Sequence, residues 1–356
     1  MTACFAKGRL KLLGSGSSLP GKSIDNSTLI SHLSRACGER TARKAHALAR
    51  QLGIKSRHLS RRLDQAISQP QVSATDLAVQ SIQQAIQQAK READLNEAGF
   101  LVTHTATPHS LLPSGAAWIA DELRLPCPYM ELRQACTGFA NALQIAQSML
   151  GQNHELKPMI LTGTEVGSVF FDIDSEFVDI NQLVNFVQMG DGSGSVIVSQ
   201  DDSSSEQIIS HCFTGHIGLG QEPGFQLEGA SSSNPTCPHG LPAFLHNPQA
   251  VRQLGPQLFI KGIEAVVSQG FELEHFAYIL PHQANGHIDR QLSDYLGIEK
   301  GRIVNDAKQL GNLGSAAIWT SFDRLRKSGK LKRGDQVLIL GAESTKYMYG
   351  GFVYTH

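Results

Sequence analysis

Three short stretches of the sequence carry side chains that could do chemistry together. Cys136 lies in "ACTGFANAL", where a polar segment gives way to apolar residues at helical spacing. His282 lies in "ILPHQAN", after a β-type apolar run, and Asn312 lies in "LGNLGS", between two glycines. A nucleophilic sulfur with an imidazole and a carboxamide as polar partners, each at the end of an element, is an arrangement that covalent catalysis uses.

The sulfur can react because of its place at the start of a predicted helix. Helix N-termini favour negative charge, since their first amide groups have no partner within the helix. A thiol there can have its pKa lowered from about 8.5 to roughly 3.5–7.5. The local patterns also have plainer explanations: Cys136 could be a packing residue, His282 a surface histidine, and Asn312 the tip of an ordinary turn.

Alternating strands and helices must position these three residues. The apolar runs predict strands at 9–15, 99–105, 158–164, 195–199, 276–281, 335–341 and 351–356. Helical spacing predicts helices at 73–92, 114–124, 136–150, 248–269, 284–296 and 314–329. The alternation predicts an α/β architecture, with sheets covered by helices. A polar stretch at 199–207 divides the chain into residues 1–200, with the cysteine, and 201–356, with the histidine and asparagine; residues 226–242 predict an exposed loop.

Composition excludes several classes of protein. The net charge of −1 gives no reason to expect nucleic acid as a partner, and no apolar run is long enough to cross a membrane. The first residues lack the pattern of a signal peptide. The six cysteines form no CxxC pair and no metal-type spacing with histidine, so we expect no metal and a reducing, cytoplasmic location.

A basic stretch covers residues 35–63, with nine Arg or Lys residues against one acidic residue, Glu39. Such a run can be a solvated helix face, or it can attract an anionic partner. The local charge alone leaves both readings open.

Taken together, the motifs resemble those of the thiolase superfamily, and most closely the ketoacyl-ACP synthase III group. "ACTGFANAL" resembles the nucleophile segment, "MGDGSGSVIVS" the Gly-Asp-Gly motif, "PHQAN" the histidine motif and "LGNLGSAA" the asparagine motif. They occur in family order over nearly the whole chain. The resemblance implies a duplicated αβαβα five-layer fold with two similar halves and mixed sheets, usually as a homodimer.

The resemblance also implies a reaction. Cys136 would take an acyl group from a coenzyme A or acyl carrier protein thioester, without any other cofactor. His282 and Asn312 would stabilise the enolate that forms when a malonyl-type unit loses carbon dioxide, and this carbanion would attack the acyl-cysteine. A neutral amide at Asn312 can donate a hydrogen bond to the enolate, which favours decarboxylative condensation to a 3-oxoacyl product in fatty-acid-like or secondary-metabolite biosynthesis.

Departures from the family pattern predict a specialised member. The residues that grip the adenine of coenzyme A are replaced, so Arg50, Lys55 and Arg57 of the basic stretch become candidates for docking a carrier protein or coenzyme A. The C-terminal loop reads "LGAESTKYMYGGF" where the family has a glycine-rich loop. By resemblance, the substrate-binding candidates are Leu112, which replaces an aromatic residue reaching across the dimer, and Phe139, Gly314, Ser344, Tyr347 and Met348.

Two other functions compete with condensation. The acyl-Cys136 intermediate could pass its acyl group to an oxygen or nitrogen nucleophile without decarboxylation. Alternatively, the chain could be a non-catalytic partner subunit of a heterodimeric synthase, although such subunits lack the nucleophile that this chain retains.

Overall fold

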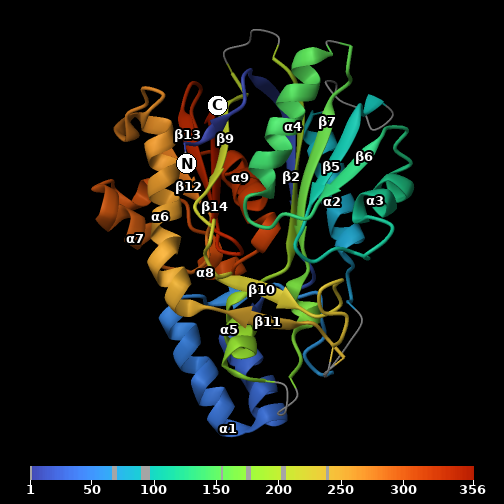
Figure 1. Ribbon diagram of the computed structural model, residues 1–356, viewed down its shortest axis with the longest axis vertical. Coiled ribbons are helices and arrows are strands. Elements are labelled where there is room, and N and C mark those ends of the chain that lie inside the picture. The colour runs from blue at the N-terminus through green and yellow to red at the C-terminus, as the bar shows by residue number, and fades with distance from the viewer. Residues whose placement is uncertain are drawn as a thin grey trace.

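One large mixed sheet runs through the protein (Figure 1). The computed structural model describes residues 2–65, 70–89, 97–153, 155–173, 178–201, 206–237 and 240–356. The strands follow the order β12-β13-β14-β9-β2-β8-β7-β5-β6, with β1 paired to β9. Their bounds are β1 Cys4–Phe5, β2 Leu10–Ser18, β5 Phe100–His104, β6 Tyr129–Leu132, β7 Met159–Glu165, β8 Gly192–Gln200, β9 Ile208–His216, β12 Tyr278–Pro281, β13 Gln336–Glu343 and β14 Met348–Thr355.

The strand pairing repeats along the chain. In the first part, β2 is antiparallel to β8, β8 is antiparallel to β7, and β7 is parallel to β5. In the second part, β9 is antiparallel to β14, β14 is antiparallel to β13, and β13 is parallel to β12. The two sets join where β2 pairs with β9, at Leu10–Ile209 and Lys11–Ile208. A duplicated architecture would produce this repeat; the domain boundary near residue 200 stays a prediction.

Helices cover both faces of each set of strands. Helices α4 (Gly138–Gln152) and α9 (Ala317–Lys327) lie between the two sets, and their apolar residues share one core with both. Helices α2 (Ala74–Ala89) and α3 (Gly115–Leu123) cover the outer face of the first set, and α6 (Pro248–Val267) covers that of the second (Figure 1). The predicted end of the helix at 90–92 lies outside the described residues.

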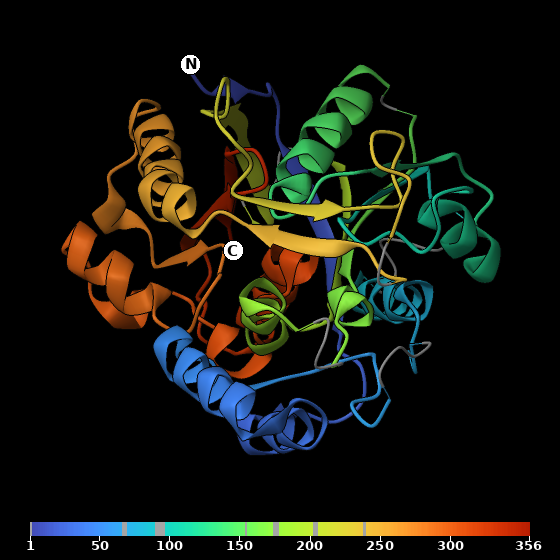
Figure 2. The same cartoon turned by 60° about the horizontal axis from the view of Figure 1, so that its bottom comes forward.

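A smaller layer lies across one end of these sheets (Figure 2). It contains α1 (Asn26–Leu52), α5 (Ile180–Gln188) and the hairpin of β10 (Phe225–Glu228) and β11 (Ala243–His246), which share a core. Helix α1 bends at Gly38, whose φ is 79°, and ends at Gly53 in the left-handed conformation. The sequence predicted the loop between β10 and β11, in which residues 238–239 are not described, but neither strand. The remaining short elements are β3 Ile24–Asp25, β4 Ser56–Arg57, α7 Ile288–Leu296, α8 Ala307–Leu310 and the 3-10 turns Gly167–Phe170, Leu273–His275, Lys300–Arg302 and Gly314–Ala316.

Glycines in β2 and β8 let helices approach the sheet closely. A side chain at Gly194 would lie 2.6 Å from the Thr320 amide of α9, and one at Gly14 would lie 2.1 Å from the Ala85 carbonyl of α2. These contacts are far below normal packing distances, so only glycine fits. The position of α9 matters for function because this helix follows the loop that carries Asn312.

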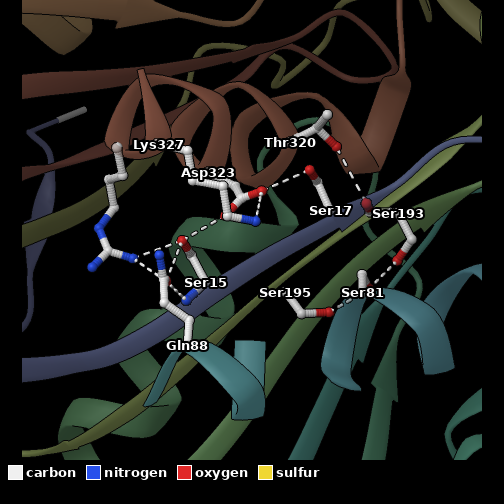
Figure 3. A network of polar contacts seen from close by, with 10 residues as sticks. Ser15, Ser17, Ser81, Gln88, Ser193, Ser195, Thr320, Asp323 and Lys327 are labelled. Carbon is white, nitrogen blue, oxygen red and sulfur yellow. Dashed lines mark hydrogen bonds and ion pairs between the residues drawn. The ribbon is translucent and has the colours of Figure 1, made fainter. Parts of the chain in front are cut away.

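Buried polar groups fix the same helices in register (Figure 3). The carboxylate of Asp323 in α9 accepts hydrogen bonds from Ser15 at 2.8 Å and Ser17 at 2.7 Å in β2. On the other face, the Ser81 hydroxyl of α2 lies 2.9 Å from that of Ser193 and 2.6 Å from that of Ser195 in β8. Because buried hydroxyl and carboxylate groups are costly unless paired, this network favours one packing arrangement.

Candidate active site

Cys136 lies two residues before α4, at the centre of the molecule. Its side chain is only partly buried, whereas Thr137 and Gly138 beside it are buried. A side chain at Gly138 would lie 2.4 Å from Nδ1 of His104, so the helix can begin here only with glycine. The sulfur is therefore held at the beginning of a buried helix, as the sequence predicted.

His282 follows β12 and reaches the same region through β13. Its amide donates to the carbonyl of Leu340 at 2.6 Å. Gly341, which follows Leu340 in β13, is close to the nucleophile segment: a side chain there would lie 3.4 Å from the Cys136 carbonyl. Burial lowers the pKa of His282 to about 4, so the imidazole is neutral at pH 7. Its buried Nδ1 has no hydrogen-bond partner among the described residues.

Asn312 is held by backbone bonds on both sides. Its amide donates to the Gln188 carbonyl at 2.8 Å, and its carbonyl accepts from the Gly190 amide at 3.0 Å. The Gly314 amide donates to the side-chain oxygen of Asn312 at 3.0 Å. Because only an oxygen can accept this bond, the orientation of the carboxamide is fixed, and its NH2 group is left as the end that can donate.

Glu165 connects the Asn312 loop to the nucleophile. This buried carboxylate at the end of β7 accepts from the Ser315 amide at 2.9 Å and the Ser315 hydroxyl at 2.8 Å, and also from the Thr107 hydroxyl. Its charge also raises the pKa of Cys136. The loop with Asn312 and the start of α4 therefore surround the same carboxylate.

Glu343 approaches Cys136 from the other side. It is the last residue of β13, and its side chain is 3% exposed. Its carboxylate accepts from the Thr137 amide at 3.0 Å, the Thr137 hydroxyl at 2.7 Å and the Gln134 side chain at 2.9 Å. Elements distant in sequence, namely α4, β7, β13 and the residues after β12 and α8, thus converge on Cys136.

The electrostatic environment corrects one expectation from the sequence. A cysteine at a helix start was expected to have a lowered pKa, but burial raises the pKa of Cys136 well above its ordinary value, and the Glu343 and Glu165 carboxylates raise it further. The amide of Thr137, the residue before α4, donates to Glu343 and is not free to stabilise a thiolate. At neutral pH the sulfur is a thiol.

Three of the residues predicted to bind substrate are buried. Phe139 is fully buried, with its ring 5.8 Å from that of Trp319 and 5.9 Å from that of Phe352, so it is a core residue. Tyr347 is also fully buried. A side chain at Gly314 would lie 2.4 Å from the Glu165 carboxylate, so this glycine makes room for Glu165.

The other predicted substrate-binding residues keep accessible surface. Ser344 and Met348 are partly buried, and the Met348 sulfur accepts from the Gln134 side chain at 3.2 Å. Leu112 is 88% exposed. Its predicted contact across a dimer stays a prediction.

Two of the three predicted docking residues line a surface cavity. Arg50 and Lys55 lie at the C-terminal end of α1, on the wall of a cavity of about 520 Å³. Lys300, Lys308 and Arg290 add further positive charge to the same wall. The cavity adjoins the loop after His282, because the Gly286 amide donates to the Leu52 carbonyl at 2.8 Å.

The prediction that Arg57 docks a partner is wrong. Its side chain is fully buried, and its guanidinium donates to the Asn26 side chain and to the Val187 carbonyl, each at 2.7 Å. Burial lowers its pKa to about 10. No partner protein can reach this arginine, which instead joins α1, β4 and α5.

Three further buried groups lie around Cys136, and sequence reasoning missed two of them, Glu165 and His104; Glu343 was noted only as a departure in the C-terminal loop. Glu165 and Glu343 both end buried strands, and an acidic residue at the end of an apolar run was the available signal. His104 ends β5 and packs against Gly138 and Gly163; burial lowers its pKa to about 4, and hydrogen bonds with the backbone of Gln134 and Ala135 oppose part of this shift.

The described part of the chain lacks a metal-binding cluster and a membrane-spanning helix. The described ranges contain no group of three or more His, Cys, Asp or Glu side chains arranged to hold a metal ion. Among the helices of these ranges, none has the length and apolar character needed to cross a membrane. The expected absence of a cofactor stays a prediction.

Comparison with known proteins indicates the family. Residues 130–215 match the family model for 3-oxoacyl-[acyl-carrier-protein] synthase III, and residues 267–354 match the model for its C-terminal part. The β-ketoacyl-[acyl-carrier-protein] synthase III of Rickettsia felis is 27% identical over 334 residues, which cover 92% of this chain and 94% of that protein.

Solved structures agree with this assignment. The tetronic acid condensing enzyme AbyA1 is 26% identical, with a TM-score of 0.83 over 98% of this chain and 100% of that one. The synthase III of Aquifex aeolicus VF5 has the same fold, with 22% identity and a TM-score of 0.78 over 98% and 100% of the two chains. The predicted thiolase-like fold is confirmed. The family-model matches and these relatives together support a synthase III-like condensing enzyme of the thiolase superfamily.

Proposed function

We propose that this protein is an acyltransferase that forms a carbon–carbon bond by decarboxylative condensation. Cys136 takes an acyl group from a thioester, and the acyl-cysteine is then attacked by the carbanion of a malonyl- or ketoacyl-type thioester that has lost carbon dioxide. The product is a 3-oxoacyl thioester. The observation that supports this proposal is that the segments carrying His282 and Asn312 both lie against the segment of Cys136: Leu340, bonded to His282, precedes Gly341 beside Cys136, and the Ser315 hydroxyl lies 3.5 Å from the Gln134 carbonyl.

The protonation state of His282 supports its role in the decarboxylation step. A neutral imidazole and the NH2 group of Asn312 can both donate hydrogen bonds to an enolate oxygen as negative charge develops on it. A carboxylate in the place of Asn312 would repel that charge. Removal of one such donor commonly reduces a rate by about 10²–10³-fold.

The cationic cavity supports an anionic carrier or coenzyme A as the donor. Arg50 and Lys55 are exposed, and neither forms an ion pair within the described ranges. In contrast, Lys308 is paired with Asp289 at 2.6 Å. A phosphate or an acidic helix bound at Arg50 and Lys55 would bring an attached thioester arm beside the loop that follows His282.

The departures at the acyl pocket support a specialised member of the family. Glu343 introduces a buried carboxylate beside the nucleophile, and Leu112 replaces the aromatic residue expected at the partner's pocket. We propose a donor other than the acetyl group used in ordinary fatty-acid initiation, within a fatty-acid-like or secondary-metabolite pathway.

We also propose that the protein is a homodimer. Large apolar side chains are exposed on the loop before α3, on α3 itself and on the edge strand β6: Leu111, Leu112, Trp118 and Tyr129. The edge of β6 has no neighbouring strand in the sheet order, which leaves this side open to a second copy.

A second function has one observation in its favour. The structure of this chain is similar to that of a tetronic acid condensing enzyme, with a TM-score of 0.83. A tetronic acid ring contains a cyclic ester, so its formation requires a carbon–oxygen bond as well as a carbon–carbon bond. Transfer of the Cys136-bound acyl group to an oxygen nucleophile is therefore the alternative to test.

Release of carbon dioxide distinguishes the two functions. The protein would be acylated with a panel of acyl thioesters and then given malonyl carrier protein labelled in its free carboxyl group. Condensation predicts labelled carbon dioxide and a 3-oxoacyl carrier in equal amounts. Acyl transfer to a hydroxyl acceptor without label release would contradict the condensation proposal. Rapid turnover with acetyl coenzyme A and malonyl carrier protein would contradict the specialised assignment.

A further inference from the structure

Glu343 is the buried group that the proposed reaction leaves without a role. Its carboxylate accepts hydrogen bonds from the amide and the hydroxyl of Thr137 and from the side chain of Gln134, and also from the Thr345 hydroxyl. Gln134 precedes Cys136 in the chain and Thr137 follows it. Glu343 therefore holds the nucleophile segment from both sides.

The same contact changes the charge at the start of α4. The helix has no capping bond from its own Thr137 side chain, and the Glu343 carboxylate occupies the Thr137 amide in its place. A negative charge at a helix N-terminus stabilises the helix. It also cancels the positive potential that would otherwise stabilise a thiolate at Cys136.

No positive charge among the described groups compensates for Glu343. Glu165 on β7 is a second buried carboxylate, and no ion pair to a cation is found for either one within the described ranges. His282 after β12 and His104 on β5 are kept neutral because burial lowers the pKa of each to about 4. The two charged groups that act on Cys136 are therefore both carboxylates.

We propose that Glu343 is a positioning residue that keeps Cys136 as a protonated thiol in the free enzyme. The identity of the acyl donor rests on the proposed function. The protonation state of the free thiol is independent of it. In the acylation step the S–H bond of Cys136 breaks and its sulfur bonds to the carbonyl carbon. The C–S bond of the donor breaks, and the proton ends on the sulfur of the departing thiol.

The pH dependence of alkylation tests this directly. The rate at which iodoacetamide modifies Cys136 would be measured between pH 6 and pH 10.5 by peptide mass spectrometry, which separates this residue from the other five cysteines. We expect the wild-type midpoint above the ordinary value of about 8.5. Glu343→Gln keeps an accepting oxygen for Thr137 but removes the charge, so its midpoint should fall by about one unit, a roughly tenfold larger thiolate fraction at pH 7.

Matched variants separate charge from structure. Glu131→Gln removes another partly buried carboxylate, on β6, which is not among the groups that act on Cys136, and its midpoint should match wild type. An unchanged midpoint in a folded Glu343→Gln protein would overturn the proposal. A wild-type midpoint at or below 8.5 would overturn it even if the variant does not fold.

The outcome is separable from the proposed reaction. If the midpoint shifts but no thioester acylates Cys136, the role of Glu343 stands and the proposed function fails. If Cys136 is acylated and condensation proceeds but the midpoint does not shift, the proposed function stands and the role of Glu343 fails.

Discussion

Substitution of Gly341 by alanine should damage the nucleophile more than the fold. The new Cβ would lie 2.6 Å from Cε1 and 3.0 Å from Cζ of Phe139, and 3.4 Å from the Cys136 carbonyl oxygen. Carbon atoms in contact are normally about 3.5–4.0 Å apart, so the Phe139 ring must move by about 1 Å. Trp319 and Phe352 enclose that ring, and the displacement must therefore pass into the first turn of α4.

The expected magnitudes follow from this geometry. Overpacking of a core site costs about 1–3 kcal/mol of unfolding free energy, which urea titration would measure. Misplacement of a reacting group by about 1 Å can reduce a rate by about 10²-fold. We therefore expect Gly341→Ala to remain folded but to form acyl-Cys136 about a hundredfold more slowly, as followed by rapid quench and intact-protein mass spectrometry.

Two further variants make the test specific. Gly151→Ala lies at the other end of α4, where a side chain would meet nothing within 4 Å, and it should acylate like wild type. Combining Gly341→Ala with Phe139→Leu removes the ring edge and should restore part of the rate. Normal acylation by Gly341→Ala alone would refute the claim that Gly341 positions Cys136.

Three other predictions concern the reaction, the donor and pH. His282→Ala and Asn312→Ala should still form acyl-Cys136 but lose carbon dioxide release by about 10²-fold or more; failure to load would show that these residues act earlier. Reversing charge with Arg50→Glu and Lys55→Glu together should raise KM for a carrier-bound thioester by roughly tenfold and leave turnover of a short uncharged thioester unchanged, with Lys157→Glu as the control; an unchanged KM would remove the cavity from carrier docking. Finally, His104 and His282 are neutral in the fold but charged in the unfolded chain below pH 6.5, so the stability they contribute is complete above pH 6.5 and is lost as pH falls toward 4. The Asp191 carboxyl, with its pKa raised to about 6, offsets part of this loss, because its contribution returns as pH falls. Burial also lowers the pKa of His246 to about 4, so this histidine adds to the loss. Urea unfolding should show about 3–5 kcal/mol less stability at pH 5 than at pH 7.5, and equal stability at the two pH values would contradict the neutral histidines.

The regular elements were largely predictable because their apolar spacing is local. The predicted strands at 99–105 and 158–164 correspond to β5 and β7, and the predicted helix at 136–150 corresponds to α4. The periodicity of α5 was missed because polar residues occupy part of its buried face, including Gln182 and Asn185. Short edge elements such as β10 and β11 have too few residues to show a period.

The environment of the site was not predictable from local patterns. The position of Cys136 at the start of a helix was predicted correctly, but its pKa was not, because part of the charge that raises it comes from Glu343, 206 residues from Thr137 in sequence. Arg57 lies in a basic stretch and was predicted to dock a partner, yet its side chain is buried and bonds to Asn26 and Val187. Phe139 lies in the core between the two sets of strands, where its side chain contacts other core residues.

The central claim is that Cys136 carries the acyl group, and mapping of the adduct tests it most directly. The protein would be incubated with a panel of acyl-coenzyme A and acyl-carrier thioesters, digested, and searched for acylated cysteines by mass spectrometry. The account predicts one acyl group per chain on the peptide containing Cys136, and none on Cys136→Ala. An adduct that persists in this variant, or that maps to another cysteine, would contradict it.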